Sequence, residues 1–121
     1  MGKFLTELDT REINSDDFML LEPLVYQRDS GQIITAEKGF VTDFASVPKW
    51  VPVLYVLLKD KGRKAAVLHD KFYRQGGMSK ADADKLFLEA LHACEGLTDG
   101  ERHAMYYGVK FFGYWSYKGE R

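Results

Sequence analysis

The segment between Ser79 and Gly96 constrains the fold of this chain more than any other part. Ser79 and Asp82 have the spacing of a helix capping box, and Gly96 suits the left-handed residue that follows a helix. Apolar residues recur between them every three or four positions: Ala83, Leu86, Phe87, Ala90, Leu91 and Cys94. This period predicts a helix over residues 80–95, with one face that must be covered by the rest of the chain.

Two more helices are predicted on either side of this one. Apolar residues at helical spacing predict a helix over residues 63–75, which the glycines after it terminate. Thr98 and Glu101 repeat the capping-box spacing at the start of a helix over residues 99–112. We expect one core to hold large apolar residues of the first two helices: Leu68, Phe72, Leu86, Phe87 and Leu91.

The first third of the chain has the pattern of strands and turns. Residues 18–26 are rich in large apolar side chains, residues 27–31 carry turn chemistry, and residues 32–36 are again apolar, which predicts a β-hairpin. A further extended segment is predicted over residues 40–43. The fold class is therefore α+β, with a small N-terminal antiparallel sheet or hairpin followed by three helices.

A length of 121 residues predicts a single domain with a core of its own. Pro48 and Pro52 disfavour one long helix, so a bend or a short helix is expected to join the sheet to the helices. The predicted parts are an N-terminal segment over 1–17, a β-rich part over 18–47, a helical part over 48–113 and a tail over 114–121.

Composition excludes several classes of function. Seventeen Lys and Arg against eighteen Asp and Glu leave a net charge of -1, which gives no electrostatic basis for binding nucleic acid. The longest apolar stretch, residues 50–58, is too short for an integral membrane segment, and no signal peptide is visible. Cys94, the single cysteine, is expected to be a buried apolar residue of a protein kept in a reducing compartment.

His69 is the main candidate for chemistry because it lies on the apolar face of a predicted helix, where both ring nitrogens need partners. Asp84 and Asp43 are the carboxylates expected to meet it. A carboxylate on one nitrogen would leave the other free to act as a base on water. Asp70 would point elsewhere and could bind a cation. The alternative is a structural network in which His69, Asp43 and Asp84 only join the sheet to the helices.

Other chemistries find no support in the residue pattern. A His-Asp phosphohydrolase needs a metal-binding histidine upstream of the pair, and no histidine precedes His69. Glu89 and His92 are spaced as metal ligands on one helix, but the second such helix of a two-metal site is absent. Three histidines and one cysteine offer no usual zinc ligand set, and there is no phosphate-binding glycine loop.

Three runs of residues are similar to a family found in tailed bacteriophages and prophages, domain of unknown function 1353: Gly39-Phe-Val-Thr-Asp-Phe-Ala-Ser-Val-Pro48, Ala65-Ala-Val-Leu-His-Asp-Lys-Phe-Tyr73 and Ala83-Asp-Lys-Leu-Phe-Leu-Glu-Ala90. The resemblance implies a phage accessory or virion-associated protein, for instance of the tail, located in the host bacterial cytoplasm or in the virion. Its partner would be a phage or host protein, which the aromatic end at residues 111–117 could contact, and the His-Asp cluster would be structural or bind that partner.

A looser resemblance concerns the catalytic helices of phospholipases A2, especially the parvoviral capsid type. It rests on Ala65-x-x-x-His69-Asp70-x-x-Tyr73 followed by Ala83-Asp84-x-x-Phe87. It implies a calcium-dependent hydrolase of membrane lipid or cell-envelope esters that acts in phage entry or lysis. His69 would be the base, Asp84 would orient it with support from Tyr73, and Asp70 would bind calcium. The glycine-rich calcium loop of those enzymes is missing upstream, so the run around Asp43 would have to supply further ligands.

Overall fold

The computed structural model describes residues 2–14, 17–43 and 61–112, and its strands precede its helices in the chain. The strands are β1 (Lys3–Phe4), β2 (Thr10–Glu12), β3 (Phe18–Leu20), β4 (Leu24–Gln27), β5 (Ile33–Ala36) and β6 (Val41–Thr42). The helices are α2 (Arg63–Gln75), α3 (Lys80–His92) and α4 (Asp99–Phe112). The predicted α+β class is confirmed.

The strands form two three-stranded antiparallel sheets, in the orders β1-β4-β5 and β2-β3-β6. The predicted hairpin is present as β4 and β5, and its turn closes through Gly31, whose φ of 92° favours glycine. The predicted strand over residues 18–26 is instead divided at Pro23, so that β3 and β4 belong to different sheets. Because proline has no N–H to donate, it is disfavoured inside a strand.

All three predicted helices are present, and their ends follow the local signals. The Ser79 hydroxyl accepts a hydrogen bond from the Asp82 N–H at 3.1 Å, as in the predicted cap. Thr98 and Glu101 exchange hydrogen bonds at the start of α4, at 3.0 and 3.1 Å. Helix α3 ends at His92 rather than at the predicted residue 95, because the chain tightens into a turn before Gly96, whose φ is 82°.

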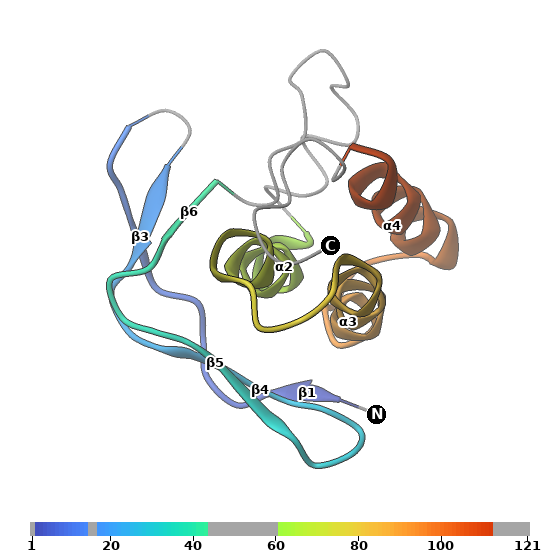
Figure 1. Cartoon of the computed structure of the whole chain (residues 1–121), viewed down its shortest axis with the longest axis horizontal. Helices are drawn as coiled ribbons and strands as arrows, with labels where there is room; N and C mark the ends of the chain where they lie inside the picture. The colour runs from blue at the N-terminus through green and yellow to red at the C-terminus, as the bar shows by residue number, and fades with distance from the viewer. Residues whose placement is uncertain (1, 15–16, 44–60, 113–121) are drawn as a thin grey trace.

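The two sheets curve around one side of α2, and α3 and α4 lie on its other side (Figure 1). One apolar core lies between these layers and includes Leu68, Leu86, Phe87 and Leu91, as predicted, with Phe72 only partly buried at its edge. Cys94 is also buried. At the sheet side of the core, the Tyr26 hydroxyl donates to Glu89 of α3 at 2.6 Å. Glu89, considered above as a metal ligand, thus bonds the sheet to α3.

No helix in the described part of the chain is long and apolar enough to span a bilayer. The bend predicted around Pro48 and Pro52, and most of the aromatic end predicted over residues 111–117, lie outside the described residues. Phe111 is described and is exposed.

Candidate functional site

Asp84 accepts hydrogen bonds from three side chains in the interior of the helical half. His69 Nε2 lies 2.8 Å from Asp84 Oδ1, and the Tyr73 hydroxyl donates to the same oxygen. Lys80 Nζ donates to the other oxygen at 2.8 Å. His69 and Tyr73 are one turn apart on α2, and Lys80 and Asp84 are one turn apart on α3, so each pair projects from one helix face. We call these four residues the Asp84 cluster.

The imidazole of His69 is enclosed by aromatic rings and is only 1% exposed. Its ring centroid lies 3.8 Å from that of Tyr73 and 5.1 Å from that of Phe87. Burial lowers the pKa of His69, and this effect exceeds the opposing one of Asp84, so the ring is neutral at neutral pH. Nε2 then carries the proton that is donated to Asp84, and Nδ1 carries the basic lone pair.

Nδ1 of His69 is buried and has no hydrogen-bond partner among the residues that the structure describes. A buried polar atom left without a partner costs about 1–3 kcal/mol, and such atoms are uncommon in folded proteins. This nitrogen is therefore the chemically distinctive atom of the cluster, because it combines basicity with the orienting carboxylate of Asp84 on the opposite nitrogen.

Asp84 is ionised in this setting. Burial raises the pKa of its carboxyl, but the hydrogen bonds from His69, Lys80 and Tyr73 together hold that pKa below its ordinary value. Lys80 supplies the compensating charge and also donates to the backbone carbonyl of Lys110 at 2.9 Å. The cluster thus joins α2, α3 and the last turns of α4.

A second group of polar side chains surrounds Asp70 at the junction of β6 and α2. Arg74 Nε donates to Asp70 Oδ1 at 2.9 Å, and the backbone N–H of Asp43 donates to Asp70 Oδ2 at 3.2 Å. Arg74 also binds the Asp43 carboxylate at 3.2 Å. Burial and the charge of Asp43 raise the pKa of Asp70 to about 6, against the opposing effects of Arg74 and Thr42.

Of the residues predicted for the site, His69, Asp84 and Tyr73 come together, whereas Asp43 does not join them. In the described structure Asp84 is the carboxylate that bonds His69, and Asp43 contacts Asp70 and Arg74 instead. Asp43 therefore meets Asp70, the residue that follows His69 on α2, rather than bonding the imidazole. The reason is that consecutive residues of α2 project about 100° apart, so the strand end that meets Asp70 does not meet His69.

Two residues of these groups, Lys80 and Arg74, were missed from the sequence. Each lies four positions from the aspartate that it binds, Lys80 before Asp84 and Arg74 after Asp70. This i,i+4 spacing of opposite charges is the signal that could have identified both. It is common on exposed helix faces, which is why spacing alone does not mark a buried pair.

The residues around Asp70 do not fit the calcium ion that the phospholipase resemblance implies. Calcium takes six to eight oxygen ligands. Here both oxygens of Asp70 accept from N–H donors, and the cation beside the two carboxylates is the Arg74 guanidinium. No group of three or more His, Cys, Asp or Glu side chains suited to a metal occurs within the described ranges.

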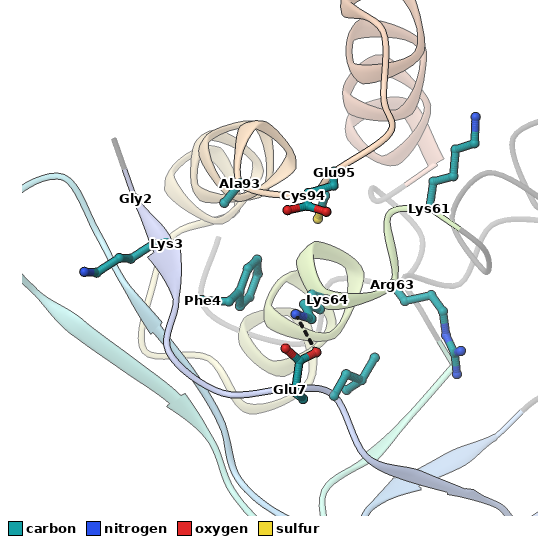
Figure 2. Close-up of a pocket in the computed structure, with 11 residues that line it drawn as sticks. Gly2, Lys3, Phe4, Glu7, Lys61, Arg63, Lys64, Ala93, Cys94 and Glu95 are labelled. Atoms are coloured by element: carbon teal, nitrogen blue, oxygen red, sulfur yellow. Dashed lines mark hydrogen bonds and ion pairs between the residues drawn. The ribbon is translucent and has the colours of Figure 1, made fainter.

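A cavity of ≈ 560 Å³ lies elsewhere, between β1, the start of α2 and the end of α3 (Figure 2). Phe4 and Cys94 form part of its wall, and Lys64 binds Glu7 across it at 3.3 Å. Neither His69 nor Asp84 is among its described lining residues. The cavity is therefore separate from the Asp84 cluster.

The fold and the site define an α+β protein in which helices carrying a buried His-Asp-Tyr-Lys cluster are covered on one side by two small sheets. The model of the family described as "Protein of unknown function (DUF1353)" matches residues 18–109, so the chain belongs to this family. The match spans β3 to most of α4 and includes every residue of the Asp84 cluster. No curated protein and no solved structure matches the chain.

His69→Gln gives a pH-dependent test of the neutral ring, because glutamine offers an amide donor for Asp84 but does not titrate. The ordinary pKa of histidine is 6.5, and that of His69 is lower in the folded chain. As pH falls below this ordinary value, the unfolded chain takes up a proton that the folded chain does not, so His69 makes folding less favourable.

We therefore expect the stability of the native chain relative to His69→Gln to fall between pH 7 and 5, by up to about 1.4 kcal/mol per pH unit. Urea denaturation at several pH values measures the difference. A difference that stays constant or grows on acidification would mean that the ring is charged in the fold.

Proposed function

We propose that this chain is a non-enzymatic accessory protein of a tailed bacteriophage or prophage, which acts by binding a phage or host protein and in which the Asp84 cluster is structural. The observation that supports a structural role is that His69 is only 1% exposed, in a cluster that joins three helices. A general base must reach a proton of its substrate or of a bound water. The enclosure of the His69 ring therefore supports a role in packing and in orienting its neighbours rather than in catalysis.

The phage assignment rests on the resemblance of the three motif runs to tailed-phage and prophage sequences, and the family match over residues 18–109 includes all three runs. Such a protein would be carried in the virion, for instance in the tail, or would act in the host cytoplasm. Mass spectrometry of purified particles distinguishes these two locations.

The decisive experiment replaces His69 with glutamine in the phage that encodes the chain. This change keeps a donor for Asp84 but removes the base. We expect the variant to fold and the phage to keep its plating efficiency. Asp84→Ala is the matched comparison, because it removes the acceptor shared by three donors and should reduce infectivity through loss of the folded protein. A folded His69→Gln protein that does not support infection would contradict the structural role.

The second candidate function is an ester hydrolase that acts on membrane lipid or cell-envelope esters during entry or lysis. The observation that favours it is the buried basic Nδ1 of His69, with Asp84 on the opposite nitrogen. In this case Nδ1 takes a proton from the attacking water, and Asp84 stabilises the resulting imidazolium. Phospholipid vesicles and soluble ester substrates serve as the assay. Turnover by the native chain that His69→Gln abolishes would establish this function.

Calcium is not expected to stabilise the native chain, because the Arg74 guanidinium already binds both carboxylates that would bind the ion. Arg74→Ala removes this guanidinium from beside Asp43 and Asp70, and we expect a rise in melting temperature with millimolar calcium to appear only in this variant. Thermal unfolding with calcium or with a chelator measures the effect. A calcium-dependent rise in the native chain would instead support the calcium-dependent form of the hydrolase.

A further inference from the structure

Strand β5 forms one edge of the sheet β1-β4-β5, and its hairpin with β4 lies at the margin of the molecule (Figure 1). Its side chains alternate: Ile34 and Ala36 are buried in the core, whereas Ile33 is 51% exposed on the opposite face. The strand contains no charged residue and no proline. Natural proteins use such residues to keep a strand edge from pairing with another chain. Strand β5 therefore lacks the sequence features that prevent edge pairing.

The other edges of the two sheets differ from β5. Strand β1 is only two residues long and carries Lys3, and the edge strand β2 carries Arg11 and Glu12. Strand β6 is also two residues long, whereas β5 has four residues. Short edge strands and charged side chains both oppose pairing with a further strand. Within the described ranges, β5 is therefore the edge best suited to accept one.

The backbone bonding groups of Ile33 and Thr35 point away from β4. Thr35 stands opposite Val25 in the ladder. The Val25 N–H, however, donates to Thr6 Oγ1 at 3.0 Å, and the Val25 carbonyl accepts from the Leu5 N–H at 2.8 Å, both on the side of β1. Such positions recur at every second residue of an antiparallel ladder, so the same holds for Ile33. The N–H and C=O groups of both residues therefore lie along the outer side of β5, where no described residue bonds them.

Two copies of this edge are complementary when they run antiparallel about a two-fold axis at Ile34. Ile33 of one copy then stands opposite Thr35 of the other, and the two residues exchange both of their N–H···O bonds. The axis repeats this pair, so every outward backbone group of both residues finds a partner. An axis at Ile33 or at Thr35 would instead set the other residue against Gly31 or Glu37, which lie outside the strand. The exposed side chain of Ile33 is covered in the same pairing, because its cross-strand neighbour is a second β-branched residue on the same face.

We propose that β5 is a homodimer interface, in which two copies of this chain pair antiparallel through Ile33 and Thr35 and join their three-stranded sheets into one continuous sheet. A second copy fits because its own edge supplies the complementary groups at the same spacing. The net charge of -1 leaves little repulsion between copies. Two short strands bury less than the roughly 800 Å² per partner of a standard interface, so the association is weak and the chain is monomeric at low micromolar concentration. The interface is independent of the Asp84 cluster and of the function proposed above.

Amide hydrogen exchange followed by NMR at about 20 μM and at about 1 mM tests the strand pairing itself. We expect exchange at the Ile33 and Thr35 amides to slow by about two- to fivefold at the higher concentration, because the monomer fraction falls. The amide of Glu12, on the edge strand of the other sheet, is the reference and should keep its rate. Exchange at Ile33 and Thr35 that does not depend on concentration would contradict the proposal.

Sedimentation equilibrium over a series on the order of 10 to 1,000 μM tests the register, because weak interfaces dissociate within that range. We expect the native chain to shift from monomer to dimer as concentration rises. Ile33→Lys alone and Thr35→Glu alone should each weaken the dimer about tenfold, because each brings like charges together across the two-fold axis. The double variant sets the introduced lysine opposite the introduced glutamate on both sides of the axis, and it should restore dimer formation.

Leu5→Lys is the matched control, since Leu5 is 48% exposed and follows β1 at the other side of the same sheet. It introduces the same charge as Ile33→Lys and should leave the dimer unchanged, and circular dichroism checks that every variant is folded. A native chain that stays monomeric throughout the series would overturn the proposal. So would a folded double variant that does not associate, or a control variant that dissociates the dimer.

Discussion

Phe87→Ala is expected to lower the free energy of unfolding by about 3–5 kcal/mol, the range for removing a buried phenylalanine from a well-packed core. Phe87 is completely buried, and its ring packs against the imidazole of His69 at a centroid distance of 5.1 Å. The substitution therefore removes apolar burial and also one wall of the pocket that holds His69. Urea denaturation followed by circular dichroism measures the loss.

The control for this prediction is Ile33→Ala, which removes apolar atoms from a side chain that is about half exposed. Surface substitutions of this kind usually change stability by less than about 0.5 kcal/mol. A loss below about 1 kcal/mol for Phe87→Ala would mean that the packing of α3 against α2 differs from that described here. The unfolding free energy of the native chain and that of the variant should fall with urea concentration at the same slope, since the surface exposed on unfolding hardly changes.

The helices could be predicted because their signals are local. Ser79 and Thr98 begin the last two helices with side-chain caps, and the apolar period of each helix identifies the face that packs on the core. These signals need no knowledge of distant residues. The one error, the end of α3 near His92, comes from a turn that tightens before the terminating glycine.

The strands were harder to predict because their pairing is non-local. Thr10–Glu12 has no alternation of apolar and polar residues, yet it pairs with Phe18–Leu20 as an edge strand. Lys3–Phe4 is too short to show a period and joins a sheet through Leu24–Gln27. The division of the predicted 18–26 strand does have a signal in Pro23, which the apolar composition around it obscured.

The site could be predicted where two helices determine it and not where a strand end takes part. His69 and Asp84 are polar residues on apolar faces of adjacent helices, and burial requires each to find a partner. The position of Asp43 depends on how the end of β6 meets α2, which the helix patterns do not specify. Asp43 therefore binds Arg74 and contacts Asp70, one residue along α2 from the position that was predicted for it.

Among substitutions of polar residues, Asp84→Ala is expected to lower the free energy of unfolding most. The expected loss is about 3–5 kcal/mol, the range for removing one partner from a buried charged pair. Lys80 would be left as a largely buried cation without its carboxylate, and the His69 and Tyr73 donors would lose their shared acceptor. Lys80 would keep its hydrogen bond to the backbone carbonyl of Lys110 in α4, which does not neutralise the ammonium charge.

The pH dependence of this loss has a defined sign. Asp84 has a pKa below the ordinary 3.8 in the folded chain, so its stabilisation is complete above that value and disappears as pH falls through the lower one. The difference in unfolding free energy between the native chain and Asp84→Ala should thus be constant from pH 8 to 5, apart from the titration of His69, and should shrink below about pH 4.

Asp82→Ala is the matched control, because Asp82 is exposed in the first turn of the same helix and contributes only about 0.3–1 kcal/mol through the helix dipole. Equal losses for the two variants, or a loss for Asp84→Ala that grows in acid, would show that the carboxylate of Asp84 is not the charged centre that holds α2 and α3 together.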